Sequence, residues 1–385
     1  MSTLSKVAGG LGELGREVGR IGWDRFGPKD ETVPASAEAV TPEVLARALD
    51  LPSGSIRAVR VLFHDRGTSD RARVEVDADE RAGLPPTLFL KMTPGTFVVR
   101  LWSNLSRLAQ KEIHFYRDAA PSIAQFVPRS YAAVWDPRRG HSLIVLEDLA
   151  ARGCTFPDTS KPCSPDQAHE VAVVLGQIHR EFLGSPRFKG DLAWFAHQRS
   201  PWTYMEGQLV RNCVRHLPGR LNALIPEDVR RSSQVLVERP GALHAMLRRL
   251  PRTLIHNDSH PGNMYFDGPT PGIYDWQNVS YGPTIHDVGY FMMFGLEIED
   301  RRKHEREILR TYLESLRGTG EEAIEWNTAW EGYQLVVATG YCSAVYTASF
   351  GSRLQREEIV TASLQRAVAA VRDLETFEVL TRLAG

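Results

Sequence analysis

The stretch "LIHNDSHPGNMYFDGPTPGIYDWQ", residues 254–277, gathers four chemically capable side chains among turn-forming residues: His256, Asp258, Asn263 and Asp275. The runs "MYF" and "GIY" predict a β-hairpin around "DGPTPG", because proline and glycine favour turns between short strand-like runs. Asn263 and Asp275 lie equally far from the midpoint of this turn. We therefore expect them to face each other at the open end of the hairpin.

This arrangement predicts a site for one hard cation. Opposed residues of an antiparallel pair have Cβ atoms about 4.5 to 5.5 Å apart, so an amide oxygen and a carboxylate can share an ion, and Mg²⁺ suits such ligands better than zinc. Asp258 lies on the loop that enters the hairpin, where its carboxylate can accept a hydroxyl proton. A cation and a positioned carboxylate are the requirements of phosphoryl transfer. A polar turn with Asx caps would explain any one of these residues but not their spacing.

A second signal lies in the first half of the chain. Lys91 ends the apolar run "LFLK", where its charge needs a partner or a phosphate group. Glu112 shares a predicted helical stripe with apolar residues, so its carboxylate would turn toward the core. An ion pair between the two satisfies both charges and holds the lysine near the phosphates of a nucleotide. A lysine that reaches solvent and an exposed glutamate are the alternative, and the sequence leaves that choice open.

The pattern of short strands followed by helices predicts an α+β fold. Residues 56–91 contain three strand-like runs in meander order, residues 103–117 predict one helix, and "SLIVLEDL" at residues 142–149 predicts a further buried strand. The chain beyond this strand is mostly helical, beginning with a capping box at Ser164 and Gln167. We expect a small antiparallel sheet with one helix, followed by a larger helical part.

Three regions follow from this pattern. Residues 1–40 form an N-terminal extension, residues 41–146 a smaller domain, and residues 147–385 a larger one. Within the extension, residues 4–21 carry a helical stripe of apolar side chains interrupted by glycines. Packing of this stripe on its own domain and contact with a partner or membrane both remain open. Thr41 is expected to start the first helix of the smaller domain.

Weaker candidates surround the predicted phosphate site. The turn "HDRGTSDRAR" offers backbone and side-chain donors at Thr68, Ser69 and Arg71 that could cover phosphates, although an ordinary hairpin turn explains it equally well. Glu147 and Leu149 follow the last strand of the small sheet, where backbone groups could bond an adenine edge. Their assignment depends on the fold inference.

Composition narrows the classes of function. The 385 residues carry a formal net charge of −1 with a pI near 6.9, so no global positive field recruits nucleic acid or an anionic membrane. Four separated cysteines without a CxxC pair fit reduced thiols. No secretory signal and no apolar run of about 20 residues is present, which predicts a cytoplasmic protein without stable membrane insertion. A homo-oligomer remains open.

The order of the motifs resembles the aminoglycoside phosphotransferase and choline kinase superfamily, relatives of the protein kinases. That order is Lys91, Glu112, "VLEDL", His256 to Asn263 in the spacing HxDxxxxN, and Asp275. "GTSDRAR", "DWQ" and "GPTIHDVGYFM" look closest to the bacterial, ecdysteroid kinase-like branch. The resemblance covers about residues 50–345, and it implies the two-lobed protein-kinase-like fold.

The resemblance also implies a role for each matching residue. Asp258 would be the catalytic base, Asn263 and Asp275 the Mg²⁺ ligands, Lys91 with Glu112 the phosphate-positioning pair, His256 a support of the catalytic loop, and Asp287 a brace beneath it. The implied activity is transfer from ATP to a hydroxyl group of a small molecule. Two departures are Asn257, where the family often has glycine, and Trp276 with Gln277 in place of the Phe and Gly of protein kinases. They leave the conformation of the loop open.

Three rival interpretations are weaker. Only eleven residues separate Asp275 from Asp287, too few for the long activation segment of a protein kinase. A metallohydrolase would need an extended strand that aims His256, Asp258 and His260 one way, with His286 recruited from a distance, but Pro261 and Gly262 favour a turn. A pseudokinase that binds nucleotide without turnover would not require the intact base and metal ligands.

The acceptor remains open among sugars, aminoglycosides, macrolides, and choline-like or steroid-like alcohols.

Overall fold

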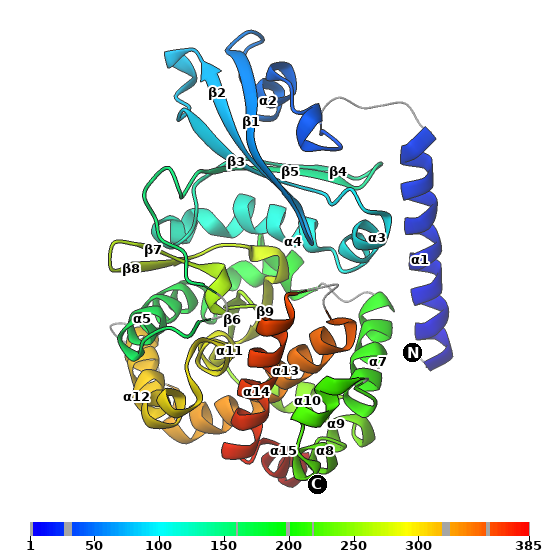
Figure 1. The fold of residues 1–385 in the computed structure, drawn as a ribbon, viewed down its shortest axis with the longest axis vertical. Coiled ribbons are helices and arrows are strands. Elements are labelled where there is room, and N and C mark those ends of the chain that lie inside the picture. Colours follow the sequence, from blue (N-terminus) through cyan, green and yellow to red (C-terminus); the bar gives the residue numbers. More distant parts are fainter. Residues whose placement is uncertain are drawn as a thin grey trace. The chain divides into compact units, whose positions relative to one another are not determined.

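The computed structural model describes residues 3–26, 33–158, 161–197, 201–217, 219–317, 324–351 and 355–384. The chain divides into two compact units (Figure 1). The first unit comprises residues 1–155, 199–205 and 274–278, and the second comprises residues 156–198, 206–273 and 279–385. The three domain ranges derived from the sequence remain a prediction of how the chain is organised. Within the predicted N-terminal extension, residues 1–2 and 27–32 lie outside the described residues.

A five-stranded sheet forms the centre of the first unit. Its strands are β1 (Ile56–Arg66), β2 (Asp70–Ala78), β3 (Thr87–Met92), β4 (Ser130–Asp136) and β5 (His141–Glu147), in the order β1-β2-β3-β5-β4. Every neighbouring pair is antiparallel. Alternate residues of the strands, including Val74, Leu90 and Val145, are buried in one core with Leu45. The predicted meander of three strands corresponds to β1, β2 and β3, and the further strand predicted at residues 142–149 corresponds to β5. Both predictions are confirmed, whereas β4 was not predicted.

Helices α1 (Thr3–Phe26), α2 (Pro42–Ala48), α3 (Phe97–Leu105) and α4 (Leu108–His114) belong to the first unit. Short helical segments occupy Ala37–Ala39, Glu80–Ala82, Phe115–Ala119, Ala120–Phe126 and Trp276–Asn278. Thr41 caps α2 as predicted, since its hydroxyl accepts the Val44 N–H. The single helix predicted over residues 103–117 is wrong. Arg107 has a φ of 57°, and a left-handed residue cannot continue a right-handed helix, so α3 ends before it and α4 begins after it.

The second unit is mainly helical. Its helices are α5 (Pro165–Phe182), α6 (Ala193–Ala196), α7 (Pro201–Arg215, which begins in the first unit), α8 (Glu227–Ser232), α9 (Val235–Glu238), α10 (Ala242–Leu247), α11 (Ile285–Gly295), α12 (Ile298–Arg317), α13 (Trp326–Phe350), α14 (Glu357–Asp373) and α15 (Thr376–Ala384). Every residue of α11 is buried. The capping box of Ser164 and Gln167 at α5 is confirmed.

Two antiparallel strand pairs interrupt these helices. They are β6 (Arg252–Ile255) with β9 (Ser280–Pro283), and β7 (Met264–Asp267) with β8 (Thr270–Ile273). Short helical segments also occupy Pro186–Lys189, Arg220–Leu224 and Pro261–Asn263. The expected α+β class, with a small antiparallel sheet and a larger helical part, is confirmed. Among the described helices, none is long and apolar enough to cross a bilayer.

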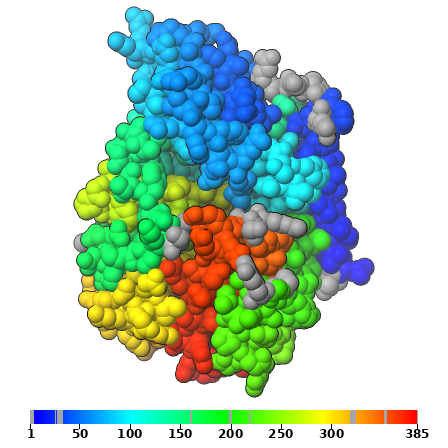
Figure 2. Space-filling model, viewed as in Figure 1, coloured from blue at the N-terminus to red at the C-terminus, as the bar shows by residue number. Residues whose placement is uncertain are grey.

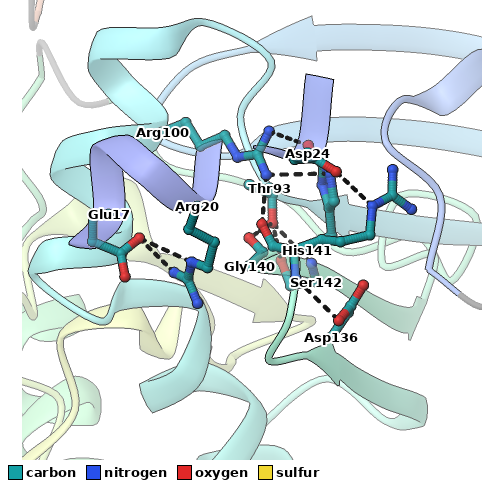
Figure 3. Close-up of polar contacts among 10 residues, drawn as sticks. Glu17, Arg20, Asp24, Thr93, Arg100, Asp136, Gly140, His141 and Ser142 are labelled. Atoms are coloured by element: carbon teal, nitrogen blue, oxygen red, sulfur yellow. Dashed lines mark hydrogen bonds and ion pairs between the residues drawn. The ribbon is translucent and has the colours of Figure 1, made fainter. Parts of the chain in front are cut away.

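The N-terminal helix α1 attaches to the first unit through a buried carboxylate. Figures 1 and 2 show α1 beside α3, and Figure 3 shows Arg100 and His141 pointing toward Asp24. Asp24 lies 2.7 Å from Arg100 Nη1, 2.5 Å from Arg139 Nε and 2.8 Å from His141 Nε2. Burial raises the pKa of Asp24, but hydrogen bonds from the two arginines outweigh it and lower the pKa to about 2. Asp24 therefore ties α1 to α3 and to β5.

The histidine of this cluster is neutral near neutral pH. Burial, together with the charge of Arg100, lowers the pKa of His141 to about 4. Because an ionised carboxylate only accepts hydrogen bonds, the 2.8 Å contact between His141 Nε2 and Asp24 Oδ2 requires the proton of the neutral imidazole to lie on Nε2.

The apolar stripe of α1 is only partly covered. Ile21 is 7% exposed, whereas Leu4, Leu11 and Val18 are 84%, 53% and 41% exposed. The packed side of the helix carries both Ile21 and Asp24, so this docking combines apolar and polar contacts.

Asp24→Asn tests this attachment. The substitution keeps the shape of the side chain but leaves Arg100 and Arg139 without their carboxylate, and we expect a loss of about 3 kcal/mol in the free energy of unfolding measured with urea. Asp77→Asn is the control, because Asp77 is 58% exposed where it pairs with Arg57, and such a pair contributes about 0 to 1 kcal/mol. Equal losses in the two variants would contradict the assigned role of Asp24.

Candidate active site

Lys91 is the buried cation of the first unit's candidate site. Its Nζ lies 2.6 Å from Glu112 Oε2 and 2.6 Å from Asp275 Oδ1. The side chains of Lys91 and Glu112 are 7% and 2% exposed. Burial alone would lower the pKa of Lys91, but the carboxylates of Asp275 and Glu112 outweigh it and raise the pKa. The structure therefore brings together three of the residues singled out in the sequence and keeps the lysine protonated.

The pKa of Glu112 is raised, whereas pairing with a cation ordinarily lowers the pKa of a carboxylate. Burial raises its pKa to about 7 despite the attraction of Lys91, and the charge of Asp275 adds to the rise. Among the residues that the structure describes, none hydrogen-bonds its Oε1 atom. One lysine between two carboxylates leaves an excess of negative charge, which an incoming cation would relieve.

The backbone around Asp275 is specially shaped. Asp275 has a φ of 64°, a left-handed conformation that aspartate tolerates better than most residues. The next residue, Trp276, stacks on Phe115 with ring centroids 3.9 Å apart and planes 7° apart. This stacking anchors the segment Trp276–Asn278 against the helical chain after α4 and places Asp275 beside Lys91.

A pocket of about 260 Å³, open solvent included, adjoins Lys91 in the first unit. Its lining includes four predicted nucleotide-binding residues: Thr68, Ser69, Lys91 and Glu112. The Thr68 hydroxyl accepts a 3.4 Å hydrogen bond from Gln277 Nε2. Hydroxyl groups and a lysine ammonium on one pocket wall are suitable donors for phosphate oxygens.

The other nucleotide candidates are engaged in local structure. Arg71 lies within β2 beside Lys91 and pairs with Asp65, so the predicted turn is shorter than expected. The Glu147 N–H donates to the Arg129 carbonyl, and the Leu149 carbonyl accepts from Cys154 N–H. Their roles toward a nucleotide remain predictions.

In the second unit, Asp287 holds the loop that follows β6. Its side chain is 1% exposed, and its two oxygens accept the backbone N–H groups of His256 at 2.6 Å and Asn257 at 2.9 Å. Burial raises the pKa of Asp287, but hydrogen bonds from His179 and His286 outweigh burial and move the pKa far below its usual range. Asp287 therefore lies beneath the loop as an ionised acceptor.

His179 is a supporting residue that the motifs of the sequence do not single out. It is fully buried, with Nε2 3.0 Å from Asp287 Oδ2 and Nδ1 2.7 Å from the Tyr312 hydroxyl. The only signal in the sequence was a polar residue beside the apolar stripe of α5. Its partner is 108 positions away, so helix periodicity could not identify the contact.

Asn257 explains one departure from the family pattern. Its φ of 67° lies in the left-handed region, which glycine adopts at no cost and asparagine adopts more readily than most residues. Asparagine therefore adopts the left-handed turn that this position of the loop requires.

Asp258 and Asn263 occupy the two ends of this loop. The Asp258 side chain is 25% exposed, and its Oδ1 accepts a 3.2 Å hydrogen bond from the Tyr290 hydroxyl. Asn263 Nδ2 donates to the Asp258 carbonyl at 2.8 Å. This bond uses the amide nitrogen of Asn263 and leaves the amide oxygen for another partner. An amide oxygen is a suitable ligand for a hard cation.

The pairing predicted for the hairpin is wrong by one residue. The β7 and β8 strands pair Met264 with Ile273, so a continued ladder would bring Asn263 opposite Tyr274 and not Asp275. The strand ends at Ile273, and the left-handed Asp275 follows outside it. The metal-ligand roles of Asn263 and Asp275 remain a prediction that does not rest on this pairing.

The geometry of the loop opposes the metallohydrolase interpretation. His256 Nδ1 accepts the Asp258 N–H at 3.3 Å and His260 Nδ1 accepts the Gly262 N–H at 3.0 Å. These imidazoles therefore cap local turns and do not project from an extended strand. Within the described parts of the chain, no group of three His, Cys, Asp or Glu residues could hold a metal ion.

Asp287→Asn tests whether the hydrogen bonds of Asp287 fix the conformation of the loop. The amide can accept through one oxygen only, so we expect hydrogen exchange at the His256 and Asn257 amides to accelerate about 10- to 100-fold, the effect of losing one hydrogen bond to a charged group. Asp191→Asn, which removes an exposed pair with Arg187, is the control and should leave these amides unchanged. Unaltered exchange in Asp287→Asn would show that other contacts hold the loop.

The chain is similar to several known kinase-like proteins. An uncharacterized kinase-like protein from Caenorhabditis elegans is 21% identical over 300 residues, 73% of this chain and 75% of the relative. A solved choline/ethanolamine kinase family protein from Mesorhizobium loti is 16% identical and covers 88% of this chain and 97% of its own, with a TM-score of 0.47. A solved choline kinase from Streptococcus pneumoniae is 14% identical over 83% of this chain and 95% of its own, with a TM-score of 0.48.

A family model gives the assignment. The model of the phosphotransferase enzyme family matches residues 82–326, which is more than half of the 385 residues. The match spans Lys91, Glu112, the loop of Asp258 and Asn263, and Asp287. The chain therefore belongs to the phosphotransferase enzyme family.

Proposed function

We propose that this protein uses ATP and Mg²⁺ to phosphorylate a hydroxyl group of a small molecule, in the cytoplasm. The observation that carries the proposal is the position of Lys91, buried at 2.6 Å from both Glu112 and Asp275. A buried lysine held by two carboxylates, beside a pocket with hydroxyl groups, suits the phosphates of a nucleotide. An ordinary structural ion pair would need only one carboxylate to neutralise the lysine.

The donor set fits the proposed cation. Asn263 and Asp275 would hold Mg²⁺ through oxygen atoms, the ligands that this ion prefers. The hydrogen bond from Asn263 Nδ2 to the Asp258 carbonyl engages the amide nitrogen, so the amide oxygen is the atom that would bind the cation. When bound, the ion would offset the negative charge of the phosphates.

Asp258 is the proposed base. Its carboxylate would accept the proton of the acceptor hydroxyl while the hydroxyl oxygen bonds to the γ-phosphorus and the bond to the leaving ADP oxygen breaks. Lys91 would contact the α- and β-phosphates, and Asp287 would keep the loop of Asp258 in place. This direct transfer needs no phosphorylated enzyme intermediate.

Asp258→Ala and Asp275→Ala separate these roles. Binding of Mg·ATP is measured by calorimetry, and turnover by ADP release with a panel of hydroxyl compounds. We expect Asp258→Ala to bind Mg·ATP like the wild type and to lose about 10²- to 10⁴-fold in turnover. Asp275→Ala should lose the Mg²⁺-dependent part of nucleotide binding as well.

Asp267→Ala is the matched control, because Asp267 is an exposed carboxylate at the turn of the same hairpin. It should retain both binding and turnover. Wild-type turnover in Asp258→Ala would remove Asp258 as the base. Mg·ATP binding by the wild type without turnover on any acceptor would favour the pseudokinase alternative.

A further inference from the structure

One face of α11 contacts the loop of Asp258 at two points. Asp287 and Tyr290 are three residues apart on this helix, so their side chains lie on the same side. Asp287 accepts the backbone N–H groups of His256 and Asn257, whereas the Tyr290 hydroxyl reaches the side chain of Asp258. The helix therefore contacts both the backbone and the carboxylate of the loop.

The Tyr290 hydroxyl connects two further groups. It lies 3.2 Å from Asp258 Oδ1 and 3.1 Å from Ser343 Oγ, which comes from α13. An ionised carboxylate only accepts hydrogen bonds, and a phenol has a single proton. The Tyr290 proton therefore points to Asp258, and Ser343 donates to the phenol oxygen. Burial, together with the charge of Asp258, raises the pKa of Tyr290 well above its usual value, so the phenol stays protonated.

The tyrosine ring is fixed by its neighbours on the same helix. Its centroid lies 5.7 Å from the His286 ring, with planes 18° apart, and 4.7 Å from the Phe294 ring, in an edge-on contact. Tyr290 is 6% exposed. Since the ring cannot swing without disturbing these contacts, its hydroxyl is a fixed point for the more exposed carboxylate of Asp258.

We propose that Tyr290 is a positioning residue for phosphoryl transfer, which fixes the rotation of the Asp258 carboxylate toward the acceptor hydroxyl, and that Ser343 acts through it. This inference rests on the proposed function. A carboxylate that is free to rotate spends less time in the reactive geometry, so loss of the phenol hydroxyl lowers the rate of transfer. Tyr290 is not among the residues that line the pocket beside Lys91, so we expect nucleotide binding to be independent of its hydroxyl.

The alternative is that Tyr290 only fills the core of the second unit. A filling role depends on the ring, whereas a positioning role depends on the hydroxyl. Tyr290→Phe keeps the ring and removes the hydroxyl, and Ser343→Ala removes the donor behind it. Tyr341→Phe is the matched control, because Tyr341 is 1% exposed on α13 and its hydroxyl bonds Ser233.

The experiment measures kcat and KM for ATP, the Kd for Mg·ATP, and the thermal midpoint of each full-length variant. We expect Tyr290→Phe to lower kcat about 10- to 100-fold, the effect of one hydrogen bond to a charged group. KM and Kd should stay within about twofold, and the thermal midpoint close to that of Tyr341→Phe. Ser343→Ala should lower kcat less, and the double variant should match Tyr290→Phe alone, because Ser343 acts on Asp258 through the Tyr290 hydroxyl that bonds both.

Several results would overturn the inference. In an active protein, a kcat for Tyr290→Phe equal to that of Tyr341→Phe would overturn it and leave the proposed function standing. Additive losses in the double variant, or an equal weakening of Mg·ATP binding, would also overturn it. A wild-type protein that releases no ADP with any acceptor would overturn both the proposed function and the role of Tyr290.

Discussion

The buried charge of Asp287 is the interaction on which the candidate catalytic loop depends. A carboxylate in the interior is costly unless donors satisfy it, and here the donors are two backbone N–H groups of the loop and the ring of His179. The same bonds that stabilise the charge thus set the conformation of His256 and Asn257. The left-handed turn at Asn257 follows from this constraint and directs the chain into Asp258.

A different arrangement of charge organises the first unit. Lys91 lies between Glu112 and Asp275, and the stacking of Trp276 on Phe115 keeps Asp275 within reach. The unit also relies on Asp24, whose carboxylate pairs with two arginines and attaches α1. In each case a buried charge joins segments that are far apart in the sequence.

Much of this organisation could be predicted from local patterns. The strands of the meander, the capping box at α5 and the hairpin after Asn263 follow from periodicity and turn residues, and the spacing of Asp258, Asn263 and Asp275 indicates the chemistry. What could not be predicted depends on contacts between distant segments or on single backbone angles. Arg107 breaks a helix through one left-handed residue, Asp275 leaves the strand ladder for the same reason, and His179 and Tyr290 acquire their contacts only when α5 and α11 meet the loop.

The most direct measurement of the central claim is the conversion of Mg·ATP by the wild-type protein across hydroxyl compounds, followed by phosphorus NMR. The account predicts that one class of compound yields a phosphate monoester in equal amount to the ADP released, and that removal of Mg²⁺ abolishes both. Absence of any phosphorylated product and of ADP above the protein-free blank, across every compound, would contradict it.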